Sequence, residues 1–174
     1  MRRLEYRGYD SAGLALLQPQ LKCLRSIGRV ADLAVQAEGL AAGIGIAHTR
    51  WATHGAPSER NAHPHVSGGL ALVHNGIVEN FAAIRRDLMA QGYVFASETD
   101  TETIAHLIDH TLKSTPDLFD AVRIATGQLG GAYAIAVVDE GEPRAVLARH
   151  GAPLLLGIAA DGHYAASDAS ALLP

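Results

Sequence analysis

Several features common in membrane, nucleic-acid-binding and disulfide-rich proteins are missing from this sequence. A single cysteine among 174 residues excludes an internal disulfide, which fits a reducing compartment, and a cytoplasmic location is expected. The formal net charge is -4 and lysine and arginine form no run, so no nucleic-acid partner is expected, since phosphate binding needs a basic surface. Glycine, histidine or charged residues interrupt each apolar stretch before it reaches bilayer length, so no membrane association is expected either.

The remaining composition is that of an ordinary globular protein. Hydrophobic residues make up 48% and charged residues 18% of the chain, which is too apolar for a disordered segment. The length suits one domain with a sizeable buried core and is short for two. We therefore expect residues 1–174 to form a single domain.

Short apolar segments separated by turn residues predict a largely antiparallel sheet structure. The expected strands cover residues 13–17, 21–27, 43–48, 70–74, 132–138, 145–148, 154–159 and 164–166. Asp161-Gly162 is a strong hairpin signal between the last two of these strands.

Three helices are expected between these groups of strands. Apolar residues recur at helical spacing over 81–88, before Gly92. A second helix takes Asp100 or Thr101 as its N-cap, and a weaker third helix covers 118–126. Helices placed between groups of strands predict the α+β class, with sheets covered by helices.

Three polar groups of residues interrupt the apolar segments at expected strand ends. They are R-G-Y-D-S-A-G at 7–13, H-T-R-W-A-T-H-G at 48–55 and H-N-G at 74–76, with Asp100 further on at a helix start. Loops at strand ends are where rigid scaffolds commonly hold functional groups. We therefore expect the chemistry of the chain to lie in these three segments.

The second segment and Asp100 together suit a small zwitterion. The Arg50 guanidinium can bind a carboxylate through two hydrogen bonds, and Thr53 and His54 can add donors. Asp100 can bind an ammonium group. The side chains therefore predict a site that binds an amino acid at both of its charged ends.

The third segment can serve a reactive amide. The Asn75 side chain and the backbone N–H of Gly76 can both donate toward one developing negative oxygen, as in an oxyanion hole. An amino acid with a side-chain amide would satisfy this site and the two charged groups at once.

Five motifs then stand in order along the chain: R-G-Y-D-S-A-G, H-T-R-W-A-T-H-G, N-A-H-P-H, H-N-G-I-V-E-N and S-E-T-D-T-E. With them the chain resembles the glutaminase domains of the glutamine–fructose-6-phosphate aminotransferase (glucosamine-6-phosphate synthase) family, which are class II, Ntn-type glutamine amidotransferases. Amidophosphoribosyltransferases share the general pattern, but the segments 9–11 and 51–54 resemble the sugar-phosphate enzymes.

The resemblance implies a four-layer αββα sandwich that binds glutamine and needs no cofactor. Its site residues, carried onto this sequence, are Arg50, Thr53 and His54 for the α-carboxylate, Asp100 for the α-amino group, Asn75 and Gly76 for the oxyanion hole, Arg7 beside the nucleophile, and Trp51 in a loop that closes over glutamine. It also implies a partner isomerase domain that binds fructose 6-phosphate, which these 174 residues do not contain, and a possible homodimer of the full-length enzyme.

One feature of that family is missing here. Its nucleophile is an N-terminal cysteine whose own α-amine acts as the base. This sequence opens at Met1, resembling the end of the family's first helix, so the opening strand and most of that helix are absent. Cys23 lies inside an expected strand and has no free amine, so we interpret it as structural rather than as a reactive thiol.

We therefore expect the chain as given not to hydrolyse glutamine. A truncated product or misplaced gene start is favoured over a genuine glutamine-binding relic. A non-enzymatic module that binds glutamine or a partner stays open as an alternative. The lost strand would leave a sheet edge exposed, which predicts lowered stability or aggregation.

The histidines allow a different interpretation. His63 and His65, with His48, His54 and His74, invite a metal-dependent hydrolase, but their spacing matches no standard signature and cysteine ligands are lacking, so no metal is expected. A helical spacing separates two further histidines, His106 and His110, which we expect at the polar edge of their helix as surface groups. Glu98 and Glu102 are expected as charges near the start of that helix.

Overall fold

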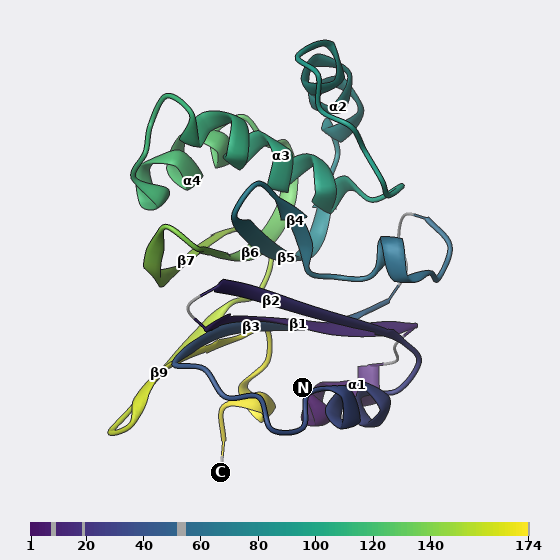
Figure 1. Cartoon of the computed structure of the whole chain (residues 1–174), viewed down its shortest axis with the longest axis vertical. Coiled ribbons are helices and arrows are strands. Elements are labelled where there is room, and N and C mark those ends of the chain that lie inside the picture. Colours follow the sequence, from purple (N-terminus) through teal and green to yellow (C-terminus); the bar gives the residue numbers. More distant parts are fainter. Residues whose placement is uncertain (8–9, 19, 52–54, 174) are drawn as a thin grey trace.

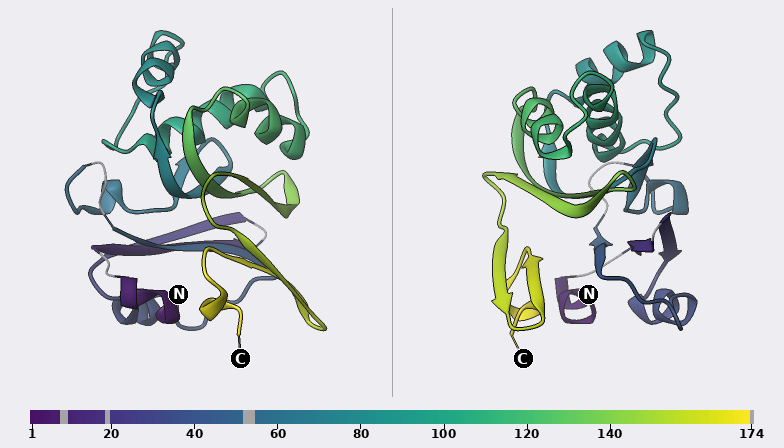
Figure 2. Two further views of the ribbon diagram at one scale, coloured as in Figure 1. Left: turned by 180° about the vertical axis from the view of Figure 1, so that it is seen from behind. Right: turned by 60° about the vertical axis from the view of Figure 1, so that its left-hand side comes forward.

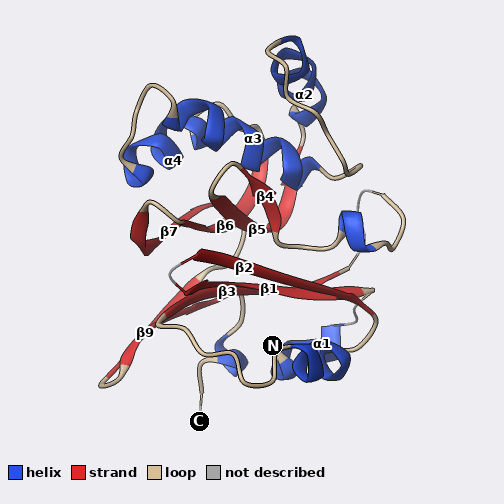
Figure 3. Cartoon of the chain, in the orientation of Figure 1, coloured by secondary structure: helices blue, strands red, loops and turns tan. Residues whose placement is uncertain are grey.

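Figure 1 shows the computed structural model of the chain, which describes residues 1–7, 10–18, 20–51 and 55–173, with the side chains of residues 2 and 7 left out. Two antiparallel sheets face each other, one with strand order β2-β1-β3 and one with order β4-β5-β6-β7. Helices lie on the outer side of each sheet (Figure 3). None of the described helices is long and apolar enough to cross a membrane.

The elements follow in chain order as η1 (Arg2–Arg7), β1 (Ser11–Gln18), β2 (Gln20–Ile27), α1 (Val30–Gln36), β3 (Ile44–Arg50), η2 (Glu59–Asn61), β4 (His65–Ser67), β5 (Leu70–Val78), α2 (Phe81–Ala90), α3 (Asp100–Leu112), α4 (Leu118–Thr126), β6 (Gly131–Asp139), β7 (Glu142–His150), β8 (Leu155–Ala159), β9 (Gly162–Ala166) and η3 (Ala169–Ala171). The η elements are short 3-10 helices.

In the three-stranded sheet, β1 lies at the centre and pairs antiparallel with β2 and with β3. α1 covers the outer face of this sheet, where Val30 and Leu33 pack against Ala12. The Glu5 carboxylate of η1 accepts a hydrogen bond from the Val30 N–H at 2.8 Å, which holds η1 against the start of α1. Within the described part of the chain, β3 pairs with a strand on one side only. An unpaired strand edge therefore faces away from β1.

The four-stranded sheet presents different residues to its two faces. Successive side chains of a strand point to opposite faces, so in β5 Leu70 and Leu72 pack on the side of the helices, whereas Ala71 and Val73 point toward the three-stranded sheet. α3 packs against β4 and β5, and α4 against β7. The main core therefore lies between the helices and this sheet.

The last part of the chain returns to the three-stranded sheet. The hairpin of β8 and β9 continues from β7 past the level of that sheet, as both views in Figure 2 show. The Tyr6 hydroxyl donates to the Asp168 carboxylate at 2.7 Å, which joins η1 to the segment after β9. The beginning and the end of the chain therefore lie close together.

The expected α+β class and antiparallel sheets are confirmed. The sequence-based interpretation missed α1 and β4, which are 7 and 3 residues long and too short for a clear periodic pattern. The N-cap of α3 is Thr99 rather than Asp100 or Thr101, because its hydroxyl accepts from the Glu102 N–H at 3.3 Å. Residues 74–76 were expected beyond a strand end, but β5 continues through them to residue 78.

The expectation that His106 is a surface group is wrong. Its side chain is buried, and the Nδ1 atom hydrogen-bonds with the Ser67 hydroxyl at 2.8 Å. Glu102 is also buried rather than a solvated charge at the helix start, since its carboxylate accepts from the N–H groups of Ala96 and Ser97 at 2.9 and 2.7 Å. His106 faces β4, and Glu102 faces the loop before α3, because α3 is packed on several sides.

Candidate functional site

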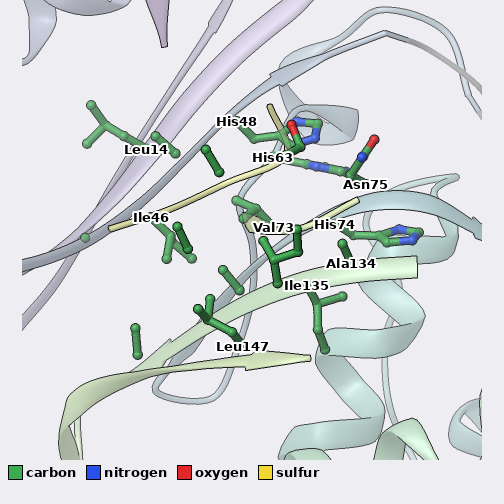
Figure 4. A pocket seen from close by; sticks show the side chains of 18 of the residues that line it. Leu14, Ile46, His48, His63, Val73, His74, Asn75, Ala134, Ile135 and Leu147 are labelled. Carbon is green, nitrogen blue, oxygen red and sulfur yellow. The ribbon is translucent and has the colours of Figure 1, made fainter. Parts of the chain in front are cut away.

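A cavity of about 1130 Å³ lies between the two sheets. Its lining includes consecutive residues of β3 and β9 as well as side chains of β5, β6 and β7. Figure 4 shows His48, His63 and Asn75 gathered at one end, while Leu14, Ile46 and Leu147 lie toward the other. The cavity therefore has a polar end and an apolar end.

Arg50 is the last residue of β3 and lines the polar end. Its side chain is almost fully buried, and its guanidinium donates to the Asp10 carboxylate at 3.2 Å and to the Gly55 carbonyl at 3.0 Å. The backbone also joins the two residues, because the Asp10 N–H donates to the Arg50 carbonyl at 2.8 Å. Asp10 therefore orients a buried cation at the cavity.

The predicted site residues did not include Asp10. Asp10 belongs to the first polar segment, but nothing in the spacing of residues 10 and 50 indicates that they are in contact. They do so because β1 and β3 are paired antiparallel, which places Ser11 opposite Arg50. The ion pair is thus a consequence of strand register.

Asp100 is the first residue of α3 and lines the same cavity. Its carboxylate is buried and accepts a hydrogen bond from the Val78 N–H at 2.9 Å. The His74 Nδ1 atom lies 3.8 Å from the carboxylate and hydrogen-bonds with the Thr101 hydroxyl at 3.1 Å. The N-terminus of a helix favours a negative charge, so α3 helps to keep an anion at this buried position.

Asn75 and Gly76 lie within β5 and also line the cavity. His74 turns toward α3, so the alternation of the strand directs the Asn75 side chain toward the space between the sheets (Figure 4). Gly76 has a φ of +134°, and a Cβ atom at this position would collide with the Ala132 carbonyl of β6. A glycine is therefore needed for the backbone to take this conformation here.

Of the other predicted site residues, Trp51 lies within the described part of the chain, whereas three lie wholly or partly outside it. Trp51 follows Arg50, lines the cavity and is 67% exposed, which puts an aromatic ring at the entrance. Thr53 and His54 lie outside the described residues. Arg7 ends η1, and its side chain also lies outside the described part. The cavity therefore brings together Arg50, Trp51, Asn75, Gly76 and Asp100 of the predicted set.

Three imidazoles, those of His48, His63 and His65, form a cluster beside this site. The ring centroids of His48 and His63 are 4.2 Å apart, and those of His63 and His65 are 5.2 Å apart. Burial, with the charges of His74 and Arg50 adding to it, lowers the pKa of His48 to about 3. Burial, followed by the charges of Arg25 and Arg50, lowers the pKa of His65 to about 3. These rings are therefore neutral near pH 7.

The pKa of His63, which lies between His48 and His65, is lowered as well. Burial is the main cause that lowers its pKa well below the ordinary value, and the neighbouring His48 and His65 rings add to it. Across the described residues no group of three or more histidine, cysteine or acidic side chains is arranged to hold a metal ion. The metal interpretation of these histidines therefore gains no support.

Cys23 lies in β2, away from the polar end of the cavity and outside its lining. Its side chain is half-buried and packs against the small cluster between the sheets. Burial raises the pKa of its thiol, and the nearby Arg25 opposes that shift. A thiol with a raised pKa is a poor nucleophile, which supports a structural role.

The chain matches known proteins along most of its length. The family model described as glutamine amidotransferase domain matches residues 48–174. The whole chain is 60% identical to 30% of the isomerizing glutamine–fructose-6-phosphate aminotransferase of Acidithiobacillus ferridurans. Over 99% of the chain, it is 55% identical to 29% of the protein of the same name from Pseudomonas putida. The chain thus spans about a third of the length of these relatives.

The chain is also similar in structure to a solved amidotransferase. The glutamine phosphoribosylpyrophosphate amidotransferase of B. subtilis superimposes with a TM-score of 0.82 and 28% sequence identity. The match covers 95% of this chain and 37% of that one. A glutamine aminotransferase class-II domain protein from Silicibacter pomeroyi shares the fold, with a TM-score of 0.55 at 19% identity.

Proposed function

The chain belongs to the class II glutamine amidotransferase domains, and from this premise we propose that it binds L-glutamine at the polar end of the cavity between its sheets. The observation that carries the proposal is that two buried side chains of opposite charge, Arg50 and Asp100, line one cavity. A buried charge is costly unless polar partners surround it, and Asp10 and the Val78 N–H supply only part of the partners that Arg50 and Asp100 can take. A zwitterion that pairs with both would offset part of that cost.

The two charges set the orientation of the ligand. The guanidinium of Arg50, held by Asp10, binds the α-carboxylate, and Thr53 and His54 add donors to it. Asp100, at the start of α3, binds the α-ammonium group. The neutral imidazoles beside Arg50 add no positive charge, so the two ends of the site keep opposite signs.

The amide end of glutamine then lies at Asn75. The Asn75 side-chain amide and the Gly76 N–H donate to the amide oxygen, where negative charge develops during acyl transfer. Both donors belong to β5, which pairs with β6 along its whole length, so they are held in place before the ligand binds. Trp51 covers the bound ligand from the entrance, and in a longer protein Arg7 would lie beside the nucleophile.

We further propose that residues 1–174 alone bind glutamine without hydrolysing it. The reaction needs a nucleophile at the amide carbon. The one cysteine in this sequence, Cys23, lies in β2 outside the cavity lining and has a raised pKa. Binding without turnover is therefore the activity of this stretch of chain by itself.

In a longer protein the same domain would supply ammonia from glutamine to fructose 6-phosphate and so make glucosamine 6-phosphate. Support comes from the name shared by the relatives, glutamine–fructose-6-phosphate aminotransferase. An isomerase domain would bind the sugar phosphate, and the complete protein would be cytoplasmic and could form a homodimer. The glutaminase domain, which includes residues 1–174, would then be a four-layer αββα sandwich of the Ntn type.

Calorimetry on purified 1–174 tests the proposal. The chain should bind L-glutamine, and Asp100→Asn should weaken binding about 10- to 100-fold, because a hydrogen bond to a charged group contributes about 1.5–3 kcal/mol. Asp109→Asn is the matched control, since Asp109 is an aspartate of the same helix that hydrogen-bonds with Tyr93. Equal affinity in all three proteins would contradict the assigned role of Asp100.

An ammonia assay tests the second part of the proposal. Purified 1–174 should release no ammonia from glutamine above a buffer control. Ammonia release that disappears in an Asn75→Ala variant would show turnover in this stretch of chain and would refute the claim.

A further inference from the structure

Asn61, the first residue of the motif N-A-H-P-H, has no part in the site described so far. It ends η2 and has no solvent-exposed surface. A buried asparagine must have its amide hydrogen-bonded, because an unsatisfied polar group is costly to bury. Its partners therefore indicate what it holds in place.

These partners lie in two separate loops. The Asn61 side-chain N–H group donates to the Ala56 carbonyl at 2.8 Å and to the Glu98 carboxylate at 3.1 Å. The Asn61 side-chain oxygen accepts from the Glu98 backbone N–H at 3.0 Å. One buried amide thus joins the loop after β3 to the loop before α3.

Each of these loops carries one charged end of the site. Ala56 follows Gly55, whose carbonyl accepts a hydrogen bond from the Arg50 guanidinium at 3.0 Å. Glu98 stands two residues before Asp100. The loop before α3 is in turn fixed by Glu102, which binds the N–H groups of residues 96 and 97.

A second side chain joins the same segments. The His65 Nε2 atom hydrogen-bonds with the Thr99 hydroxyl at 3.0 Å, and the ring also hydrogen-bonds with the backbone of Asn61. Asn61 and His65 therefore form two parallel connections between η2 and the residues that precede Asp100.

We propose that Asn61 is a positioning residue that fixes the spacing between Arg50 and Asp100, and so makes the site select a ligand with both charged ends. The inference rests on the proposed binding of glutamine at these two residues. A ligand held at two points gains affinity from the fixed distance between them, because the second contact forms at a high effective concentration. A ligand with only one charged end gains nothing from the distance between Arg50 and Asp100.

Three ligands distinguish positioning from a general structural role. L-glutamine has both charged ends, 5-amino-5-oxopentanoate lacks the α-amino group, and 4-aminobutanamide lacks the α-carboxylate. Affinities for 1–174 and its variants are measured by calorimetry for glutamine and by NMR titration for the two weaker ligands. Asn61→Ala should lower the affinity for glutamine about tenfold. It should change the affinity for either ligand with one charged end by less than about twofold.

Asn80→Ala is the matched control. Asn80 also joins two segments through its side chain, donating to the Gln128 carbonyl at 2.8 Å and accepting from the Gly130 N–H at 2.8 Å, but it does not line the cavity. This variant should lower the melting temperature and leave all three affinities unchanged. If Asn61→Ala does not fold, Asn61→Asp replaces it, because aspartate keeps the acceptor for the Glu98 N–H and loses the donors to the Ala56 carbonyl and to the Glu98 carboxylate.

The outcomes separate the two proposals. A wild-type chain that is folded and does not bind glutamine would overturn the proposed function, and the role of Asn61 with it. The role of Asn61 alone would be overturned by a different result. In that case the wild-type chain binds glutamine, and the Asn61 variant lowers the affinity for all three ligands equally or for none of them.

Discussion

On the face of the four-stranded sheet that meets α3 and α4, the described residues form one cluster of fifteen buried hydrophobic side chains, whereas the face toward the other sheet has a cluster of five. Beside the smaller cluster lies the cavity with Arg50 and Asp100. The same strands thus stabilise the fold on one face and hold the proposed ligand on the other.

Buried polar atoms without a hydrogen-bond partner occur on both faces among the described residues, and on the side of α3 they include Thr103 Oγ1 and His106 Nε2. The cavity side contains the neutral imidazoles of His48 and His63, whose Nδ1 atoms have no hydrogen-bond partner among the described residues. Burial of such groups costs stability. Because its hydrophobic cluster is smaller and borders a cavity, the side with the site is predicted to be the less stable one, as is common for binding sites.

Acidification should give the largest effect. An unfolded histidine takes up a proton near pH 6.5, whereas the folded-state pKa of His48 and of His65 is about 3, and that of His63 is also lowered. The free energy of unfolding therefore has its full value well above pH 6.5. It falls as the pH drops toward 3, because the unfolded state then binds more protons than the folded state. Between pH 7 and 5.5 we expect a loss of about 4 kcal/mol in the free energy of unfolding, measured by urea unfolding.

A variant sharpens this test. Replacing His63 with glutamine removes one of the three buried imidazoles, so the loss between pH 7 and 5.5 should become about a third smaller. A stability that does not change over this interval in the wild-type chain would contradict the burial of the three rings in neutral form.

Two valine substitutions compare the two faces directly. Val137 belongs to the large cluster and has no exposed surface, whereas Val73 belongs to the small one and lines the cavity. Val137→Ala should lower the free energy of unfolding by about 2–3 kcal/mol, since it removes buried methyl groups and leaves a void. Val73→Ala should cost about 1 kcal/mol, because that side chain already borders open space.

Chemical unfolding of both variants provides the measurement. A loss at Val73 equal to or greater than that at Val137 would mean that the two faces are packed alike, and the comparison would fail.

Much of the site could be predicted because its residues stand at recognisable points of the sequence. Arg50 ends an apolar segment, and Asp100 stands next to the N-cap of a clear amphipathic helix, so local patterns indicate both. The structure brings these residues together with Asn75 and Gly76 in one cavity. Their proposed roles toward glutamine stay predictions.

The supporting contacts could not be predicted in this way. The pair of Asp10 and Arg50 depends on strand register, and the contact of Asn61 with Glu98 joins residues 37 positions apart. His106 was misjudged because a helical pattern shows which residues share a face but not that a strand packs against it. Such contacts arise only from tertiary packing.

A structure of 1–174 with L-glutamine bound would show whether Arg50 and Asp100 hold one ligand between them. We predict the ligand carboxylate within hydrogen-bonding distance of Arg50, its ammonium group within that distance of Asp100, and its amide oxygen turned toward Asn75. Glutamine bound at another place, or held by only one of the two charged residues, would contradict the account.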